Sequence, residues 1–300
     1  MSKTQKHHHR TSAGDKLLTI FVVVFMIIFV LFTLYPVINT VALSFNDGID
    51  AVRGGIYLWP RKFATKNYET VLGMQNLWTG AKITVLRTVI GTLTSLVVNA
   101  LVAFVISRKR FLFKSGFSLF WVITMYVNGG LIPTFILFKS LGLTSSFNVY
   151  WIPGMVGAFN ILVLRTYMLG LPDSLEESAQ LDGAGYLTIF ARITSPLCKP
   201  VYATVALFVA VGQWNSWFDA MLYIRMKTEF KTLHFEIMNL LSSVMQQSGS
   251  ADNAKYGTDA ITPMTIRAAA TVVTMLPIIC LYPFLQRYFV TGLTIGGVKE

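Results

Sequence analysis

The chain has 300 residues, of which 54% are hydrophobic and only 13% are charged, and its mean hydropathy is +0.58. A soluble domain typically has about 25% charged residues, so this composition indicates a protein of the lipid bilayer. The net charge of +11 does not indicate a nucleic-acid partner, because the cations are spread over short polar segments between apolar runs.

Six apolar windows are long enough to cross a hydrocarbon core of about 30 Å, which takes roughly 20 residues per helix. They are Leu17–Leu43, Ile83–Ile106, Phe117–Phe138, Val149–Leu169, Leu197–Ile224 and Met264–Leu285. We therefore predict an all-α integral membrane protein with a six-span domain over residues 17–290 and short tails over residues 1–16 and 291–300. The first window is too long for a cleaved leader and has no small-residue cleavage site, which predicts a retained helix.

The flanking cations predict the orientation, because lysine and arginine in short loops stay on the cytoplasmic side. Lys3, Lys6, Arg10 and Lys16 precede the first window, and the segment 107–116 has four more cations and no acid. Both tails and the loop 170–196 are thus predicted to be cytoplasmic. The segments 46–80, 139–148 and 225–263 are predicted to be external.

The loop 170–196 has the pattern of two short helices. Pro172 and Asp173 favour a helix start, and acids in a first helical turn interact well with the helix dipole. Gly183 and Gly185 then favour a turn. A second amphipathic stretch follows over residues 186–193, and Pro196 is typical of the start of the fifth span.

No pattern in the chain indicates catalysis. It has no H-E-x-x-H motif, no paired cysteines and no phosphate-binding loop, so we predict neither an enzyme nor a metal site. His7, His8 and His9 are adjacent on a polar tail, where solvation is the more common role. Cys198 and Cys280 are interpreted as packing residues.

The loop also contains a recognisable motif. Glu177, Ser178 and Ala179 are followed after three residues by Gly183, and after nine more by Ile193-Thr194-Ser195-Pro196. This resembles the cytoplasmic E-A-A…G…I-x-L-P motif of permease subunits in binding-protein-dependent ABC importers. Ser178 and Ser195 depart from that pattern, but both are small. The resemblance extends over roughly residues 16–300 and is strongest to the carbohydrate-uptake branch, through segments such as Gln213-Trp214-Asn215 and Gln286-Arg287-Tyr288.

The resemblance implies a type I ABC importer permease with a coupling helix between spans four and five. The residues that would dock on an ATPase are Glu177, Ser178, Ala179, Asp182, Gly183, Ala184, Gly185, Ile193 and Pro196. The implied partners are a second permease, two ATPases that bind ATP and Mg, and an extracytoplasmic solute-binding protein. The implied location is a bacterial cytoplasmic membrane. The implied cargo is a carbohydrate, for which we expect an oligosaccharide that can contain uronates, such as alginate or pectin fragments.

Polar residues at membrane depth are candidates for the substrate pathway, because they cost free energy unless they face a cavity or another helix. The candidates are Asn128, Gly129, Asn160, Gln213, Trp214, Asn215 and Trp217. Helix packing is the alternative for each of them. A kink is expected at Asn128–Gly130, and Arg87, Arg165 and Arg267 are expected to extend their charges toward the membrane surface.

The external segment 225–263 is too long for a simple turn and is a candidate contact for the receptor, with a disordered surface loop as the alternative. An ion-gradient-driven secondary transporter is the alternative function. It usually needs intramembrane acids, and Asp219 is the only Asp or Glu in the six windows. An intramembrane enzyme is disfavoured by the lack of a catalytic pairing in any window.

Overall fold

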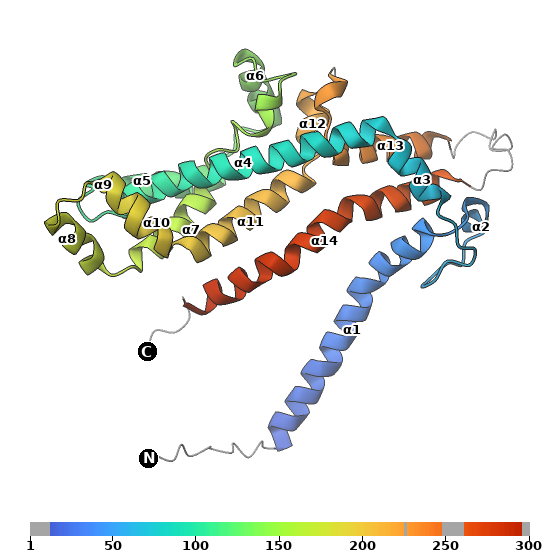
Figure 1. Cartoon of the computed structure of the whole chain (residues 1–300), viewed down its shortest axis with the longest axis horizontal. Helices are drawn as coiled ribbons and strands as arrows, with labels where there is room; N and C mark the ends of the chain where they lie inside the picture. Colours follow the sequence, from blue (N-terminus) through green and yellow to red (C-terminus); the bar gives the residue numbers. More distant parts are fainter. Residues whose placement is uncertain (1–12, 225–226, 248–260, 296–300) are drawn as a thin grey trace. The chain divides into compact units, whose positions relative to one another are not determined.

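The computed structural model of the chain describes residues 13–224, 227–247 and 261–295 (Figure 1). Within these ranges the regular elements are helices, and strand-like pairing is limited to one isolated bridge between Asn46 and Phe63. The all-α prediction is therefore confirmed.

The helices have the following bounds. They are α1 (Ala13–Ser44), α2 (Gly48–Val52), α3 (Lys66–Gly73), α4 (Gln75–Ser107), α5 (Lys114–Tyr126), α6 (Leu131–Ser140), α7 (Ala158–Leu169), α8 (Asp173–Leu181), α9 (Tyr186–Thr188), α10 (Ser195–Leu197), α11 (Lys199–Asn215), α12 (Phe218–Tyr223), α13 (Leu233–Gln247) and α14 (Pro263–Ile295). Short 3₁₀ turns lie at Phe147–Tyr150 and Thr228–Phe230, and a π-helical turn lies at Ile189–Thr194.

Contacts divide the chain into two units, of which the first contains residues 1–71 and 252–272. Its centre is the buried Asn67 side chain, whose amide donates to the carbonyls of Ser44 (3.0 Å) and Asn46 (2.9 Å). The Thr265 hydroxyl donates to the Asn67 Oδ1 at 2.8 Å. One buried amide thus joins the end of α1, the turn after it and the start of α14.

The second unit contains residues 72–251 and 273–300, and α4 is its central helix. At 1.5 Å per residue, the 33 residues of α4 extend about 50 Å. Its closest partners within the unit are α7, α11 and α13. One apolar core lies toward the end of α4, around Phe104, Leu164 and Ile189, and another contains Tyr150, Tyr223 and Phe235.

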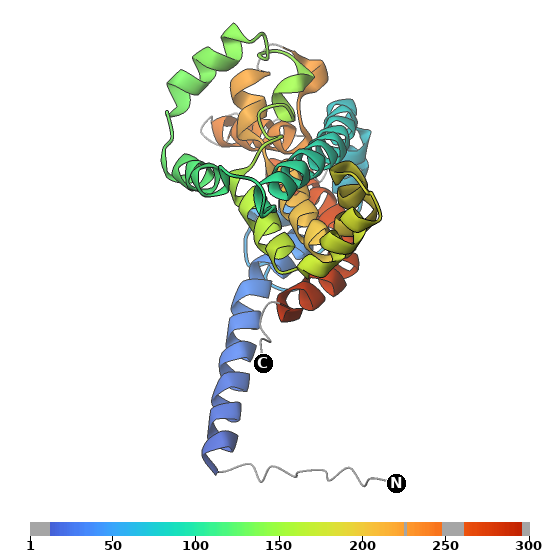
Figure 2. The ribbon, with the colours of Figure 1, turned by 90° about the vertical axis from the view of Figure 1, so that its left-hand side faces the viewer.

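Helices occupy the first, second and sixth predicted windows, and each is long and apolar enough to cross a membrane: Gly14–Ser44, Gln75–Ser107 and Pro263–Cys280. The α14 helix continues to Ile295 and so includes the start of the predicted tail 291–300. The third window is broken where a kink was predicted, because α5 and α6 meet at 113° (Figure 2). Gly130 allows the break with a φ of 87°.

The prediction for the fourth window was wrong over its first half. Only α7 is an α-helix there, with 12 residues, and residues 151–157 before it are irregular. The buried Asn99 side chain of α4 pairs with this segment: its amide donates to the Met155 carbonyl (3.2 Å), and its Oδ1 accepts from the Gly157 N–H (2.9 Å). A side chain of another helix thus satisfies backbone groups that helical pairing would otherwise use.

The fifth window is also interrupted, which corrects the predicted continuous span 197–224. Helix α11 begins at Lys199 after an 80° bend and ends at Asn215, and α12 begins only at Phe218. Pro196 therefore lies before the bend, in α10. The segment 225–263 contains the amphipathic α13, which ends at Gln247. The predicted polar centre of this segment is residues 246–250, of which 248–250 lie outside the described residues.

Candidate functional site

The loop element, defined as residues 173–197, turns sharply after α8. Gly183 has a φ of 79°, which favours glycine. Its N–H donates to the Gln180 carbonyl (3.0 Å), and the Ala184 N–H donates to the Ala179 carbonyl (2.9 Å). This pair of bonds is the Schellman arrangement, which closes a helix C-terminus. The left-handed backbone conformation at position 183 therefore explains why glycine is favoured there.

Charged pairs join α8 to the end of α4. Arg108, which caps α4, forms an ion pair with Glu176 while its guanidinium lies 4.4 Å from the Phe104 ring centre. Both partners are mostly buried, with 14% and 23% of their side chains exposed. Lys109 and Asp173 form a second pair, which is largely exposed. The first turn of α8 is thus fixed to the longest helix of its unit.

The apolar underside of the loop element packs on the core of the second unit. Ala179 and Ile189 are buried there, and the Phe190 ring lies 5.1 Å from the Phe104 ring, centre to centre. Ile193 is half-buried in the π-helical turn against the same core, whereas Pro196 is exposed in α10. A π-helical turn rather than a regular helix occupies the second predicted stretch, 186–193, after its first three residues.

The outer side of the loop element is unusually apolar for an exposed turn. Leu181 is 90% exposed and Leu187 is 77% exposed. A shallow groove runs between α8 and α9, lined by Arg110, Glu177, Gln180, Leu181, Gly183, Ala184, Gly185, Tyr186 and Ile189. Glu177, Ser178 and Asp182 are exposed beside it. The predicted motif residues thus divide into a buried anchor and an exposed surface.

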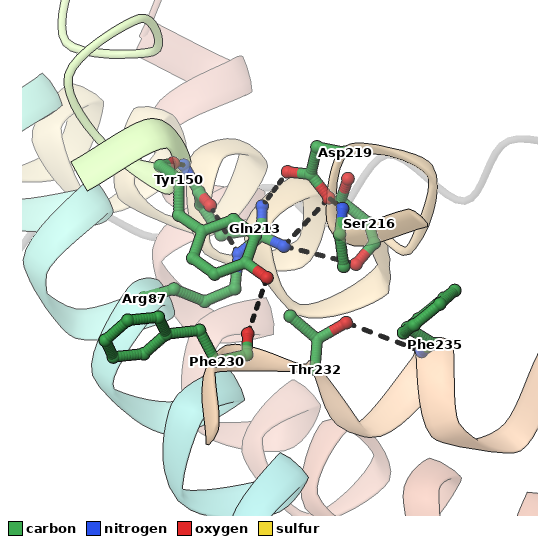
Figure 3. A network of polar contacts seen from close by, with 9 residues as sticks. Arg87, Tyr150, Gln213, Ser216, Asp219, Phe230, Thr232 and Phe235 are labelled. Carbon is green, nitrogen blue, oxygen red and sulfur yellow. Dashed lines mark hydrogen bonds and ion pairs between the residues drawn. The ribbon is translucent and has the colours of Figure 1, made fainter. Parts of the chain in front are cut away.

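A second cluster lies around Arg87 of α4 (Figure 3). The guanidinium donates to both carboxylate oxygens of Asp219 (2.5 and 3.1 Å), to the Gln213 Oε1 (3.0 Å) and to the Ser216 carbonyl (3.3 Å). It also lies 4.3 Å from the centre of the Tyr150 ring. The Tyr150 hydroxyl donates to the Phe230 carbonyl at 2.6 Å. These residues form the Arg87 network.

The Arg87 network corrects the expectation that Arg87 extends toward the membrane surface. Its side chain is 2% exposed, because the break between α11 and α12 presents Ser216 and Asp219 to it. Gln213 is also used within the chain, since its Nε2 donates to the Tyr150 carbonyl at 3.1 Å. Burial, together with the charge of Arg87, lowers the pKa of the nearby His234, so its neutral form is favoured.

The other predicted pathway residues do not gather at one place. Asn128 and Gly129 are exposed in the break between α5 and α6, and Asn160 is in the first turn of α7. The Trp214 indole is buried and donates to the Thr274 carbonyl (3.3 Å), which favours packing. Asn215 is exposed, and Trp217 is half-buried beside an open pocket.

Sequence reasoning missed the roles of Asn99 and of the Arg87–Asp219 pair. Both were visible as polar residues in apolar windows, and Asp219 was noted as the one acid among them. The missing information was the partner, since Arg87 and Asp219 are 132 positions apart.

No family model matches the chain, but individual proteins are similar over most of its length. It is 34% identical over 278 residues to the polygalacturonan/rhamnogalacturonan transport system permease protein YtcP of Bacillus subtilis, covering 92% of this chain and 96% of that protein. It is 31% identical to protein LplC of the same organism, covering 89% and 90%. It is 28% identical to the arabinooligosaccharides transport system permease protein AraQ of Halalkalibacterium halodurans, covering 88% and 91%.

Solved structures are similar in the same way. A chain in the crystal structure of a bacterial ABC transporter involved in the import of the acidic polysaccharide alginate matches with a TM-score of 0.82 and 30% identity, over 95% of this chain and 100% of that one. A chain in the structure of a bacterial alginate ABC transporter in complex with an alginate pentasaccharide-bound periplasmic protein matches with a TM-score of 0.59 and 15% identity, over 91% and 93%. The second match shows the fold alone.

Proposed function

The chain belongs to the carbohydrate permeases of ABC importers, and from that premise we propose that its loop element is the coupling helix through which an ATPase subunit drives transport. The chain is a membrane protein and a permease subunit for a carbohydrate. The full importer would add a second permease, two ATPases that bind ATP and Mg, and an extracytoplasmic receptor.

The observation that carries this proposal is the construction of the loop element. An exposed apolar surface at Leu181 and Leu187 is suited to bury against another protein. The same element is tied to α4 by the Arg108–Glu176 pair and packs on the core through Ala179. A displacement of the exposed side would therefore be transmitted to α4, because the loop element is fixed to this helix and is not a flexible loop. Closure of the ATPases would bias the permease between inward- and outward-facing states.

We propose six crossings of the cytoplasmic membrane, with both termini inside. Three long helices, the bent α5–α6 pair, the short α7 and α11 supply one segment for each predicted window. The cations of the segment 107–116 support a cytoplasmic position for the nearby loop element, since Arg108 and Lys109 bind it directly.

An ion-gradient-driven transporter is less consistent with the geometry. Such a protein needs an acid at membrane depth that is free to bind a proton or cation. Asp219 is held by Arg87 through both of its carboxylate oxygens. The candidate acid is thus neutralised by a resident cation.

We propose an acidic or uronate-containing oligosaccharide as the cargo. The names of the relatives support this choice, because polygalacturonan and alginate, named for two of them, are acidic polysaccharides. Arabino-oligosaccharides, named for a third, are neutral, so a sugar panel must include both classes.

Gly183→Asp tests the coupling role in the importer reconstituted with its ATPases, second permease and receptor. Aspartate tolerates a left-handed φ better than most residues, so the main effect is the new carboxylate, which would sit in the groove beside Glu177. We expect loss of receptor-stimulated ATPase activity and transport, with the permease still present in the membrane. Gly185→Asp places a carboxylate in the same groove without a left-handed φ, since Gly185 has a φ of −75°, so loss of coupling in both variants would assign the effect to charge on the docking surface. Full transport by Gly183→Asp would contradict the proposal.

A further inference from the structure

The second unit has an open pocket near the start of α4, whereas the loop element lies at the other end of this helix. Helix α13 crosses α4 near its start, where the Leu233 N–H donates to the Thr84 hydroxyl (2.9 Å), whereas the loop element is tied to Arg108 at the other end. The pocket lies among α6, α12 and α13 and has a volume of about 720 Å³. That volume is within the usual range of ligand pockets, about 300–1,000 Å³.

The pocket walls combine aromatic and polar side chains. The lining residues are Phe135, Lys139, Thr144, Ser145, Trp217, Met221, Leu222, Tyr223, Phe235, Met238, Asn239 and Ser242, and we call this set the outer subsite. The Phe135 and Tyr223 rings stack at 5.8 Å and fix one wall. The Ser145 N–H donates to the Tyr223 carbonyl (2.8 Å) from a left-handed φ of 60°, which holds the connecting turn against α12.

The side chains that line the outer subsite include a positive charge and no negative charge. Lys139 is its only ionisable amine, and none of the lining residues is an acid. Within the described residues the Lys139 ammonium makes no ion pair, and the Asn239 amide makes no hydrogen bond. In the part of the chain that the structure describes, an exposed cation and an exposed amide are thus available in a pocket that also contains Trp217.

We propose that the outer subsite binds an acidic sugar unit of the transported oligosaccharide. The carboxylate would pair with Lys139, the ring hydroxyls with Asn239 and Ser145, and the C–H face of the ring with Trp217. A charge-assisted hydrogen bond is about twice as strong as a neutral one, so Lys139 would select uronates over neutral sugars. The inference rests on the proposed function and deepens it, because it assigns the preference for acid to residues of this permease.

The test is direct binding to the purified importer complex without its receptor. A galacturonate oligosaccharide and a neutral galactose oligosaccharide of the same length are titrated by calorimetry. Removing a charged partner costs about 1.5–3 kcal/mol, so Lys139→Gln should weaken galacturonate binding about 10- to 150-fold and leave the weaker neutral binding unchanged. Lys139→Arg should retain most of the affinity. Lys199→Gln, which removes an exposed lysine at the start of α11, is the matched control and should change neither titration.

Either of two results in the sugar titrations would overturn the subsite. One is equal galacturonate affinity in Lys139→Gln and the unchanged chain. The other is a loss of affinity for both sugars together, which would assign Lys139 to folding. Co-purification of the other subunits would then show whether assembly has failed. If the pocket instead receives a receptor side chain, Lys139→Gln would weaken receptor binding and leave direct sugar binding unchanged, which also overturns it. Failure of the proposed function looks different, since no loaded receptor would then stimulate ATPase activity in the unchanged complex.

Discussion

Arg87 is a buried cation whose partners come from a distant part of the chain. Its guanidinium satisfies Asp219, Gln213 and the Ser216 carbonyl, so it holds the break between α11 and α12 against α4. Breaking a buried ion pair from one side is costly because it leaves the other charge without a partner. Removal of either charge alone is therefore expected to destabilise the fold.

We predict that Arg87→Met destabilises the protein by about 3–5 kcal/mol, because Asp219 is then left with a partly buried, unpaired carboxylate. Asp219→Leu should cost a similar amount. The double variant should cost clearly less than the sum, since no charge is left unpaired. Thermal unfolding in detergent gives the comparison, and a melting temperature unchanged by Arg87→Met would refute the prediction.

Gly183 and Arg87 show which structural features can be predicted from neighbouring residues in the sequence. Gly183 was predicted as a turn from the sequence, because helix closure depends on a few neighbouring residues. Arg87 was predicted incorrectly, because its neighbours along α4 do not reveal a carboxylate 132 positions away. Pairing of buried charges is a property of tertiary structure, and a single sequence has no record of it.

At the scale of elements, α8 depends on two ion pairs that differ in exposure. The Arg108–Glu176 pair is mostly buried, whereas Lys109 and Asp173 are 72% and 55% exposed. Exposed pairs contribute little, because water and salt screen them. Only the first pair is therefore expected to determine how firmly α8 is held.

We predict that Glu176→Gln destabilises the attachment of α8 by about 1–3 kcal/mol and that Asp173→Asn changes it much less, because the Lys109–Asp173 pair is exposed. Limited proteolysis of inside-out vesicles measures the difference, with cleavage expected to increase between residues 170 and 196 in Glu176→Gln alone. Equal cleavage of the two variants would mean that burial of the pair does not matter. The amount of sugar transported per ATP hydrolysed should also fall in Glu176→Gln.

The elements also divide by how well a sequence predicts them. The first and second spans and α8 follow from apolar runs and from glycine and proline positions, and the break at Asn128–Gly130 was correctly placed. The irregular segment 151–157 and the end of α11 at Asn215 were missed. Both depend on side chains of α4, Asn99 in one case and Arg87 in the other.

At the scale of the whole molecule, the orientation is testable with introduced cysteines. Cys280 is exposed and is first replaced by serine, whereas Cys198 is buried. We predict that a membrane-impermeant maleimide labels Lys227→Cys in intact spheroplasts and labels Leu181→Cys only after permeabilisation. Both positions are exposed, so access across the membrane decides the result. Labelling of Leu181→Cys from outside would invert the proposed topology.

The irregular segment 151–157 has a consequence for how the molecule is turned within the bilayer. Backbone that lacks helical pairing is stable at membrane depth only against protein or water, because lipid chains cannot accept or donate hydrogen bonds. Pro153 and Gly154 are exposed, and Asn99 satisfies only part of the segment. In the proposed six-span topology, we therefore expect the side of the second unit that contains them to face away from lipid, toward a neighbouring subunit or a hydrated passage. The interruption before α7 thus indicates which side of the protein is covered by other subunits or by water in the assembled importer.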